Sequence, residues 1–292
     1  MAAARQRIGG WAFDVGCSMF LRLLTPRSAL RISKMDIPYT VEVRPDTGVY
    51  NAKVGIWLFL SSEVMLFGAL FSAYVLIRVG APAGTWPHGW QDVTLGTLNT
   101  VVLATSAITT LLAWVACKVR QFGRFKFLHG CTLLLGLTFV GIHLTEYHDD
   151  LTHYEIHLSN GLIADGHLLE NNPKENYVVI DGRYVKNPKE LIDLRGQKIH
   201  DAKIKIPRSE IKDMQNYGPW HNDYMALDFT MTGLHMLHVL AGCLVIGYLW
   251  GPGRKLWKTD PERFTNRVEV SGLFWHFVDL VWIFLFPVLY LT

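Results

Sequence analysis

The chain has 292 residues, of which 50% are apolar and only 18% are charged. Soluble domains carry about 25% charged residues, so this composition indicates a membrane protein. The 28 lysines and arginines nearly balance the 25 acidic residues, without a basic stripe, which argues against a nucleic-acid partner. Four cysteines in this length exclude a disulfide-stabilised scaffold, and the apolar and aromatic content excludes disorder as the main state.

Five segments are long and apolar enough to cross a membrane. A bilayer core about 30 Å thick requires roughly 20 apolar helical residues. The qualifying segments are 54–77, 95–117, 127–145, 229–250 and 272–291. We therefore expect an all-α membrane protein whose five transmembrane helices form a bundle.

The distribution of positive charge predicts the orientation of these helices. The N-terminal 53 residues hold eight lysines and arginines, the loop 118–126 holds four and the loop 251–271 holds five, whereas the connection 79–94 holds none. Cytoplasmic loops of membrane proteins carry the excess of positive charge. The N-terminus is therefore predicted to lie inside and the C-terminus outside.

Residues 148–227 form a polar insertion that this topology places outside, between the third and fourth spans. They contain ten basic and thirteen acidic residues, and they include six of the twelve histidines. Asn160-Gly161 and Asp165-Gly166 are typical of turns, and 177–180 and 183–186 read as a hairpin around Asp181-Gly182. We expect a partly β extramembrane domain.

The predicted boundaries follow from these segments. Residues 1–53 form an inner or interfacial segment, in which 11–24 is interpreted as an amphipathic interfacial helix. The first three spans occupy 54–147, the insertion 148–227, and the last two spans 228–292. His153 and His157 would share one face if their segment were helical; solvated surface histidines are favoured there over a metal site.

The polar residues inside the predicted spans carry the functional information, because charges within a bilayer are costly and usually face protein or water. Glu63 lies near the middle of the first span. Two interpretations stay open: a proton-linked or lipid-facing site, or a protonated carboxyl group bonded to a neighbouring helix. Glu146 ends the third span, which we interpret as an interfacial position.

Two pairs of polar residues are spaced three apart, which places the members of each pair on one helix face. His235 and His238 in the fourth span could ligate haem or a metal ion, although metal sites usually need further ligands. His276 and Asp279 in the fifth span are interpreted as an internal hydrogen-bonded pair, favoured over a metal-bound histidine with its orienting carboxylate. We predict no metal ligand and no catalytic residue in the chain.

Five short motifs, in order along the five spans, resemble subunit III of the haem-copper cytochrome oxidases. They are Ser62-Glu63-Val64-Met65-Leu66-Phe67, Leu98-Asn99-Thr100, Glu146-Tyr147, Thr232-Gly233-Leu234-His235-Met236-Leu237-His238-Val239 and Trp275-His276-Phe277-Val278-Asp279-Leu280-Val281-Trp282. The resemblance covers about half of the chain. Many members of the family have seven spans and a shorter loop in place of the insertion, and both differences set this chain apart.

The resemblance implies a non-redox accessory subunit of a terminal oxidase in the bacterial inner membrane. Haems and copper would lie in partner subunits I and II, and this chain would hold no cofactor apart from a bound phospholipid. Glu63 corresponds to a buried glutamate of the family. His235, His238, His276 and Asp279 match its polar positions within the bundle, where they would have structural and proton-environment roles. The insertion would lie near the docking site of cytochrome c.

Three alternatives stay open. The same fold serves as a subunit of quinol oxidases and nitric oxide reductases, and the residues of this subunit do not separate these complexes. A stand-alone b-type cytochrome or membrane anchor would use His235 and His238 as haem ligands, together with His129, His143 or His276. A proton-coupled transporter built around Glu63 is disfavoured, because such proteins often show inverted repeats and none is visible here.

Overall fold

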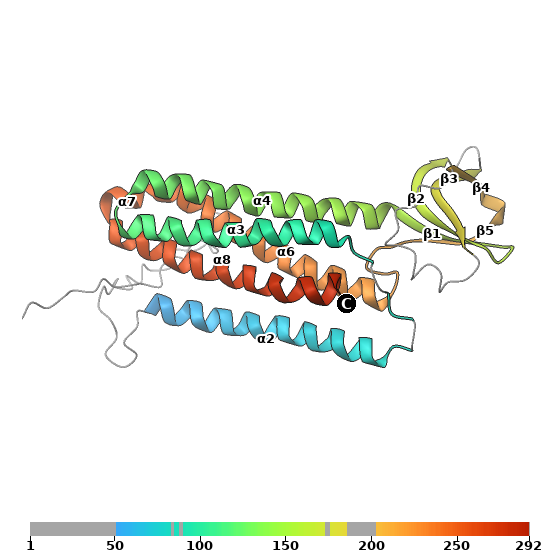
Figure 1. Cartoon of the computed structure of the whole chain (residues 1–292), viewed down its shortest axis with the longest axis horizontal. Coiled ribbons are helices and arrows are strands. Elements are labelled where there is room, and N and C mark those ends of the chain that lie inside the picture. Colours follow the sequence, from blue (N-terminus) through green and yellow to red (C-terminus); the bar gives the residue numbers. More distant parts are fainter. Residues whose placement is uncertain (1–50, 83–84, 88–89, 173–175, 186–202, 292) are drawn as a thin grey trace, which may run out of the picture. The chain divides into compact units, whose positions relative to one another are not determined.

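The computed structural model describes residues 51–82, 85–87, 90–172, 176–185 and 203–291. The interfacial helix predicted at 11–24 lies outside the described residues. Five long helices dominate the described chain: α2 (Asn51–Gly80), α3 (Val93–Lys118), α4 (Phe122–Thr152), α6 (Asp223–Trp250) and α8 (Pro261–Tyr290). Each is long and apolar enough to cross a membrane, which confirms the five predicted spans (Figure 1). A short 3₁₀ turn, Pro252–Arg254, and the helix α7 (Lys255–Thr259) connect α6 to α8.

The described residues fall into two compact units, each of which contains parts of all five helices. Of the described residues, the first unit comprises 51–65, 107–133 and 241–277, and it includes the two loops rich in lysine and arginine at 118–126 and 251–271. The second comprises 66–106, 134–240 and 278–292, and it includes the insertion. We call the helix ends that belong to the second unit the outer ends, following the predicted topology.

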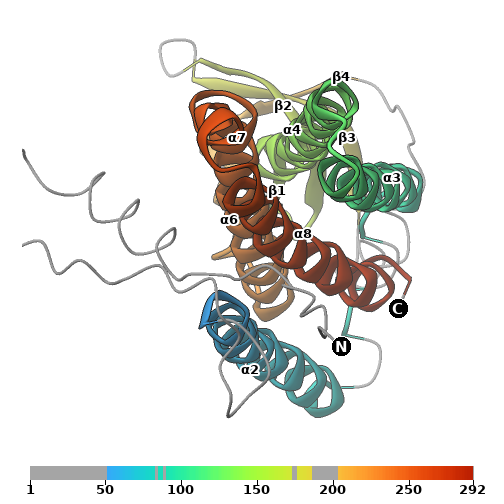
Figure 2. The same cartoon turned by 90° about the vertical axis from the view of Figure 1, so that its left-hand side faces the viewer.

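Apolar packing holds α3, α4, α6 and α8 together in the first unit. A buried cluster there combines residues from all four helices: Ala113, Ala116, Cys117, Phe125, Leu249, Phe264 and Val268. The helix α2 lies beside α8 (Figure 2), where Lys53 forms an ion pair of 2.9 Å with Glu269 and the ring of Phe59 contacts that of Phe274. Glu269 also accepts a hydrogen bond from the Trp114 indole on α3, at 3.1 Å, so one carboxylate links three helices.

The insertion is a five-stranded antiparallel sheet, which confirms its predicted β character (Figure 1). Its strands are β1 (His153–Leu158), β2 (Ile163–Asn172), β3 (Tyr177–Val185), β4 (Lys203–Pro207) and β5 (Ile211–Asn216), in the order β4-β3-β2-β1-β5. Its core contains Ile156, Leu158, Ala164, Val178, Ile180 and Ile206. The turn predicted at Asn160-Gly161 joins β1 to β2, with Gly161 at a φ of +82°.

The hairpin predicted around Asp181-Gly182 is wrong, because β3 continues through both residues. The turn predicted at Asp165-Gly166 is wrong as well, because both residues lie within β2. Gly166 and Gly182 face each other across the two strands, and a Cβ atom on either would collide with the backbone of the other strand. These glycines allow the backbones of the two strands to approach closely, which is one reason for glycine within a strand.

Candidate functional site

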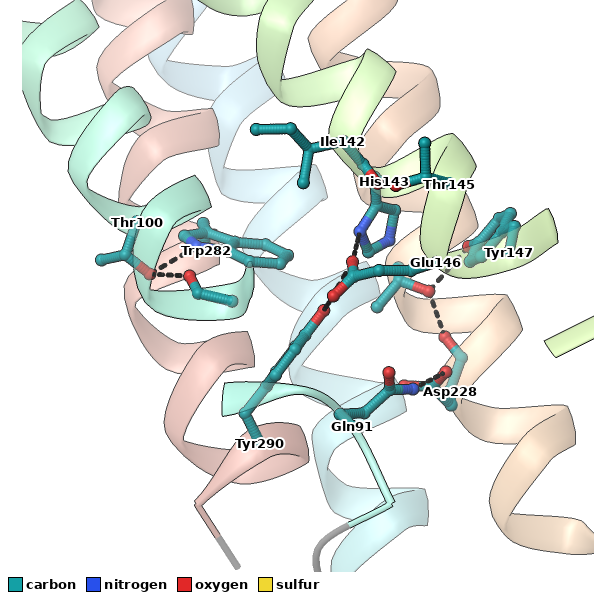
Figure 3. A network of polar contacts seen from close by, with 12 residues as sticks. Gln91, Thr100, Ile142, His143, Thr145, Glu146, Tyr147, Asp228, Trp282 and Tyr290 are labelled. Atoms are coloured by element: carbon teal, nitrogen blue, oxygen red, sulfur yellow. Dashed lines mark hydrogen bonds and ion pairs between the residues drawn. The ribbon is translucent and has the colours of Figure 1, made fainter. Parts of the chain in front are cut away.

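The outer ends of α3, α4, α6 and α8 enclose a network of polar side chains (Figure 3). Its centre is Glu146, which is buried. The Nδ1 atom of His143, one turn earlier on α4, lies 2.8 Å from a Glu146 carboxyl oxygen. The Tyr290 hydroxyl at the end of α8 donates to the same carboxyl group at 3.0 and 3.1 Å. This buried carboxyl group is thus hydrogen-bonded by two side chains from the protein.

The placement of Tyr290 depends on Gly96 near the start of α3. A Cβ atom on Gly96 would lie 2.5 and 2.6 Å from two carbon atoms of the Tyr290 ring, far inside van der Waals contact. Glycine at this position therefore lets the ring lie against the backbone of α3, from where its hydroxyl reaches Glu146. Small residues commonly allow such close contacts between membrane helices.

A second branch of the network connects α4 to α6. The Thr232 hydroxyl donates to the backbone carbonyl of Asp228, at 2.5 Å, so its oxygen is free to accept from the Tyr147 hydroxyl, at 2.7 Å. The Gln91 amide, just before α3, donates to a carboxyl oxygen of Asp228 at 2.9 Å (Figure 3). Asp228 is 1% exposed, and its other carboxyl oxygen has no hydrogen-bond partner among the described residues.

Trp282 of α8 forms the aromatic side of the network. Its indole nitrogen donates to the Thr100 hydroxyl of α3 at 3.0 Å (Figure 3). The indole stacks on the His235 ring, with 5.3 Å between ring centroids, and meets the Phe139 and His143 rings edge-on. Four helices therefore contribute to one packed set of rings and hydrogen bonds.

The predicted site residues lie in different environments. His235 is buried against Trp282, and neither of its ring nitrogens has a hydrogen-bond partner among the described residues. His238 is half-buried, bonds the Leu234 carbonyl of its own helix through Nδ1, at 2.7 Å, and packs edge-on against Phe67 of α2. Glu63, on α2, is half-buried.

The predicted hydrogen bond between His276 and Asp279 is wrong. Asp279 is buried, and neither of its carboxyl oxygens has a hydrogen-bond partner among the described residues. His276 is half-buried on the same helix. Spacing of three residues places two side chains on one helix face but does not direct their polar atoms toward each other.

The prediction that the third span ends at Glu146 is also wrong. The helix α4 continues to Thr152, so Glu146 lies well before its end and is only 7% exposed. The sequence motif Glu146-Tyr147 was visible, but its partners Tyr290 and Thr232 are distant in the sequence. The sequence did not indicate a role for Asp228 or Tyr290, and it indicated His143 only as a haem ligand of the alternative stand-alone cytochrome.

A second cluster of polar residues lies on the sheet. His153 and His157 share a face of β1 because they are four residues apart on a strand, whose side chains alternate. His153 contacts Asp165 of β2 at 2.9 Å, and His157 contacts Glu155 at 2.9 Å. The Tyr217 hydroxyl donates to Asp165 at 3.0 Å. These histidines bind carboxylates, which the interpretation as solvated histidines did not anticipate.

Glu155 of this cluster is paired with two histidines. Its other carboxyl oxygen lies 3.3 Å from Nε2 of His221. Burial alone would raise the pKa of Glu155, but the hydrogen bond and charge of His221, with the charge of His157, outweigh burial and leave the pKa below its ordinary value of 4.5. Within the described residues, no group of three or more histidine, cysteine or acidic residues is arranged to hold a metal ion.

Comparison with known proteins identifies the family. The family model of cytochrome c oxidase subunit III matches residues 41–158 and 221–292, which is more than half of the chain. The unmatched stretch between them begins where β1 ends and contains the other four strands. The insertion is therefore an addition to the family's common helical part.

Three relatives represent different complexes. Cytochrome c oxidase subunit 3 of Bacillus subtilis is 27% identical and covers 82% of this chain and 86% of the relative. Cytochrome bo(3) ubiquinol oxidase subunit 3 of Pseudomonas aeruginosa is 25% identical, with 82% and 85% covered. Heme-copper oxidase subunit I+III of Aeropyrum pernix is 26% identical, with 81% of this chain and 22% of the relative covered. The chain is a multi-pass membrane protein that belongs to the cytochrome c oxidase subunit III family.

Proposed function

We propose that the chain is the non-redox accessory subunit of a haem-copper terminal oxidase in a bacterial inner membrane. The observation that carries this proposal is the family match over all five membrane-spanning helices. The relatives that support it are subunits of cytochrome c oxidases and ubiquinol oxidases. The chain would support the catalytic subunit during reduction of dioxygen to water and would hold no catalytic centre of its own.

Subunit I is the first partner that we propose. The Aeropyrum pernix relative, whose name is subunit I+III, joins the two subunits in one chain, so this arrangement keeps the two in contact. Subunit II and bound phospholipid are further proposed partners, and the haems and copper would belong to subunits I and II. Exposed apolar side chains along α2, among them Trp57, Leu58, Met65 and Leu76, supply a surface suited to lipid or to a membrane-embedded partner.

Within this function, we assign the buried polar residues structural and proton-environment roles. Glu63, His235, His238, His276 and Asp279 all lie on membrane-spanning helices, where ionisable groups are rare and mark functional positions. His235 lies against the ring of Trp282, which favours a packing role over ligation.

The sheet is proposed to lie near the electron donor. It belongs to the side that the charge distribution places outside, and the family match includes only its strand β1. Replacing residues 159–216 by a short linker should leave the oxidase assembled and raise the KM for cytochrome c, with kcat unchanged. An unchanged KM in the assembled complex would contradict this placement. A complex that oxidises quinol and not cytochrome c would identify the quinol branch instead.

The accessory role is tested by comparing oxidase purified with and without this chain. Without it, haem content per catalytic subunit and the initial rate of dioxygen reduction should be retained, while activity is lost faster during continuous turnover. Loss of haem in proportion to the missing chain would show that the chain itself binds haem, and would contradict the proposal.

A further inference from the structure

Trp220 is a large aromatic side chain that the fold holds in an exposed position. It lies in the turn between β5 and α6, and its side chain is 68% exposed. Pro219 fixes the backbone before it, and the His221 amide closes the turn by donating to the Gly218 carbonyl at 3.0 Å. A Cβ atom on Gly218 would lie 2.7 Å from the Trp220 ring, so the ring lies against the bare backbone of this glycine. A tryptophan fixed in this way is preorganised for contact with another molecule.

Hydrogen bonds tie the Trp220 side chain to a membrane-spanning helix. The indole nitrogen donates to Oδ1 of Asn216 at 2.8 Å, and the side-chain amide of Asn216 donates to the Leu151 carbonyl at 3.2 Å. Leu151 belongs to the last turn of α4, and its side chain is exposed. Because the indole N–H is bonded within the protein, the apolar ring is the part of Trp220 that is offered to a partner.

The contacts at the start of α6 place Trp220 at the level where the spans end. The Tyr224 hydroxyl donates to the carbonyl of Leu289, in the last turn of α8, at 3.3 Å. Trp86 meets the rings of Tyr74 on α2 and Tyr224 edge-on. Tryptophan and tyrosine are enriched at the two surfaces of a bilayer. Trp220 precedes Tyr224 by four residues, so it lies at the outer boundary of the membrane.

The turn that carries Trp220 is also fixed to the sheet. On one side of Trp220, the Tyr217 hydroxyl donates to Asp165 of β2 at 3.0 Å. On the other side, Nε2 of His221 lies 3.3 Å from a carboxyl oxygen of Glu155 on β1. A contact between Trp220 and the membrane would therefore hold the sheet at the membrane surface.

We propose that Trp220 is a membrane anchor of the inserted sheet. Its ring lies among the headgroups and glycerol groups of phospholipids in the outer leaflet. Lipid is the occupant because Asn216 joins the ring to the exposed Leu151, so Trp220 continues the membrane-embedded surface of α4. The family match resumes only at residue 221, so Trp220 lies outside the matched part. The anchor goes beyond the accessory role proposed above and rests only on the membrane-spanning helices.

Photo-cross-linking in the intact complex, reconstituted in phospholipid nanodiscs, tests the proposal. The photoreactive amino acid p-benzoylphenylalanine replaces Trp220, and mass spectrometry identifies the products after irradiation. We expect a phospholipid adduct at residue 220. The matched control carries the same amino acid in place of the exposed Tyr184 of β3. Tyr184 pairs with Ala164, and Ala164 with Ile156, so it lies in the half of the sheet away from α4 and should give no lipid adduct.

A cross-link from residue 220 to a partner subunit, or the absence of a lipid adduct there, would overturn the proposal. If the photoreactive chain does not assemble, Trp220→Phe supplies a second measurement. The fluorescence of Trp220 is then the difference between wild type and this variant, and phospholipids brominated near the glycerol should quench it. A difference that bromine leaves unchanged would also overturn the proposal. If the chain purifies without a catalytic subunit, the accessory function fails, yet the lipid adduct still tests the anchor.

Discussion

Buried carboxyl groups in the outer half of the bundle differ in how their hydrogen-bonding capacity is met. Glu146 is bonded by His143 and Tyr290, and Asp228 is bonded by Gln91. Asp279 has no partner among the described residues. An unsatisfied buried polar group costs about 1–3 kcal/mol. Among these three acids of the described residues, Asp279 is the one whose two carboxyl oxygens both have no partner.

Glu63→Gln is a test of the proton-environment role. The substitution keeps size and hydrogen-bonding capacity but removes the ability to ionise, so the oxidase should assemble with its normal haem content. Proton uptake during turnover, or the survival of activity over many turnovers, should be reduced, as measured by a pH indicator and by oxygen consumption. Failure to assemble would mark Glu63 as structural; assembly with wild-type turnover and uptake would contradict the functional role.

Glu155 gives the sheet a pH-dependent stability. Because its pKa is lowered in the folded state, its contribution is present above the unfolded value, near 4.5, and is lost as pH falls through the folded value. Glu155→Gln should destabilise the sheet by about 1 kcal/mol at neutral pH, and the difference from wild type should shrink below pH 4.5. Amide hydrogen exchange of β1 and β2, corrected for intrinsic rates, measures the destabilisation at neutral pH and its decrease at low pH. Glu170→Gln, in an exposed position on β2, is the control. A difference that is independent of pH would contradict the assignment.

The sequence predicted part of the candidate site. Of the ionisable residues that stand out in the apolar segments, His235 lies in the network, against Trp282, whereas no hydrogen bond among the described residues joins Asp279 to it. The sequence did not predict Tyr290, because tyrosine near the end of a span is common and its contact with Glu146 joins residues 144 positions apart. Such contacts depend on how helices pack, in this case on the space that Gly96 leaves for the Tyr290 ring. They cannot be predicted from the spacing of residues along one helix.

At the scale of helices, close packing depends on glycine at a few positions. A Cβ atom on Gly242 of α6 would lie 2.8 Å from two ring atoms of Trp275, which is fully buried on α8. The Trp275 ring is rigid and enclosed, so it has little freedom to move away. The two helices are therefore fixed at this contact by the absence of a side chain.

Gly242→Ala should destabilise the subunit by about 1–3 kcal/mol, because overpacking forces a buried ring or the backbone to shift. The control is Gly247→Ala on the same helix, where the nearest atom to a new Cβ lies 3.9 Å away. Thermal dissociation of the subunit from the complex, followed by gel filtration, compares the two. Equal dissociation temperatures for both variants would contradict this account of the packing.

The sheet shows why elements were predicted with unequal success. The helices followed from length and apolarity, since few other structures satisfy backbone hydrogen bonds in a bilayer. In the insertion, the Asp-Gly pairs predict turns, whereas Gly166 and Gly182 lie opposite each other in paired strands. The pairing of β2 with β3 depends on residues outside the two dipeptides. An Asp-Gly dipeptide alone therefore does not distinguish a turn from a close approach of two strands.

At the scale of the whole molecule, the chain combines five long helices with an antiparallel sheet. The family model matches the five helices. The sheet, inserted between α4 and α6, is not matched apart from β1. Side-chain contacts join the sheet to neighbouring segments. The ring of Trp90, before α3, packs on the ring of Tyr217, and the Tyr217 hydroxyl donates to Asp165 of β2. The added domain is thus attached through specific side chains rather than by the polypeptide alone.

The central claim is that this chain is an accessory subunit without a redox centre of its own. It is tested most directly by purifying the tagged chain in mild detergent, identifying every copurifying subunit and recording a reduced-minus-oxidised spectrum. We predict recovery of a haem-copper catalytic subunit, with all haem remaining on that partner after the two are separated. Recovery of the chain alone with bound haem would contradict the account and would direct attention to His235 and His238.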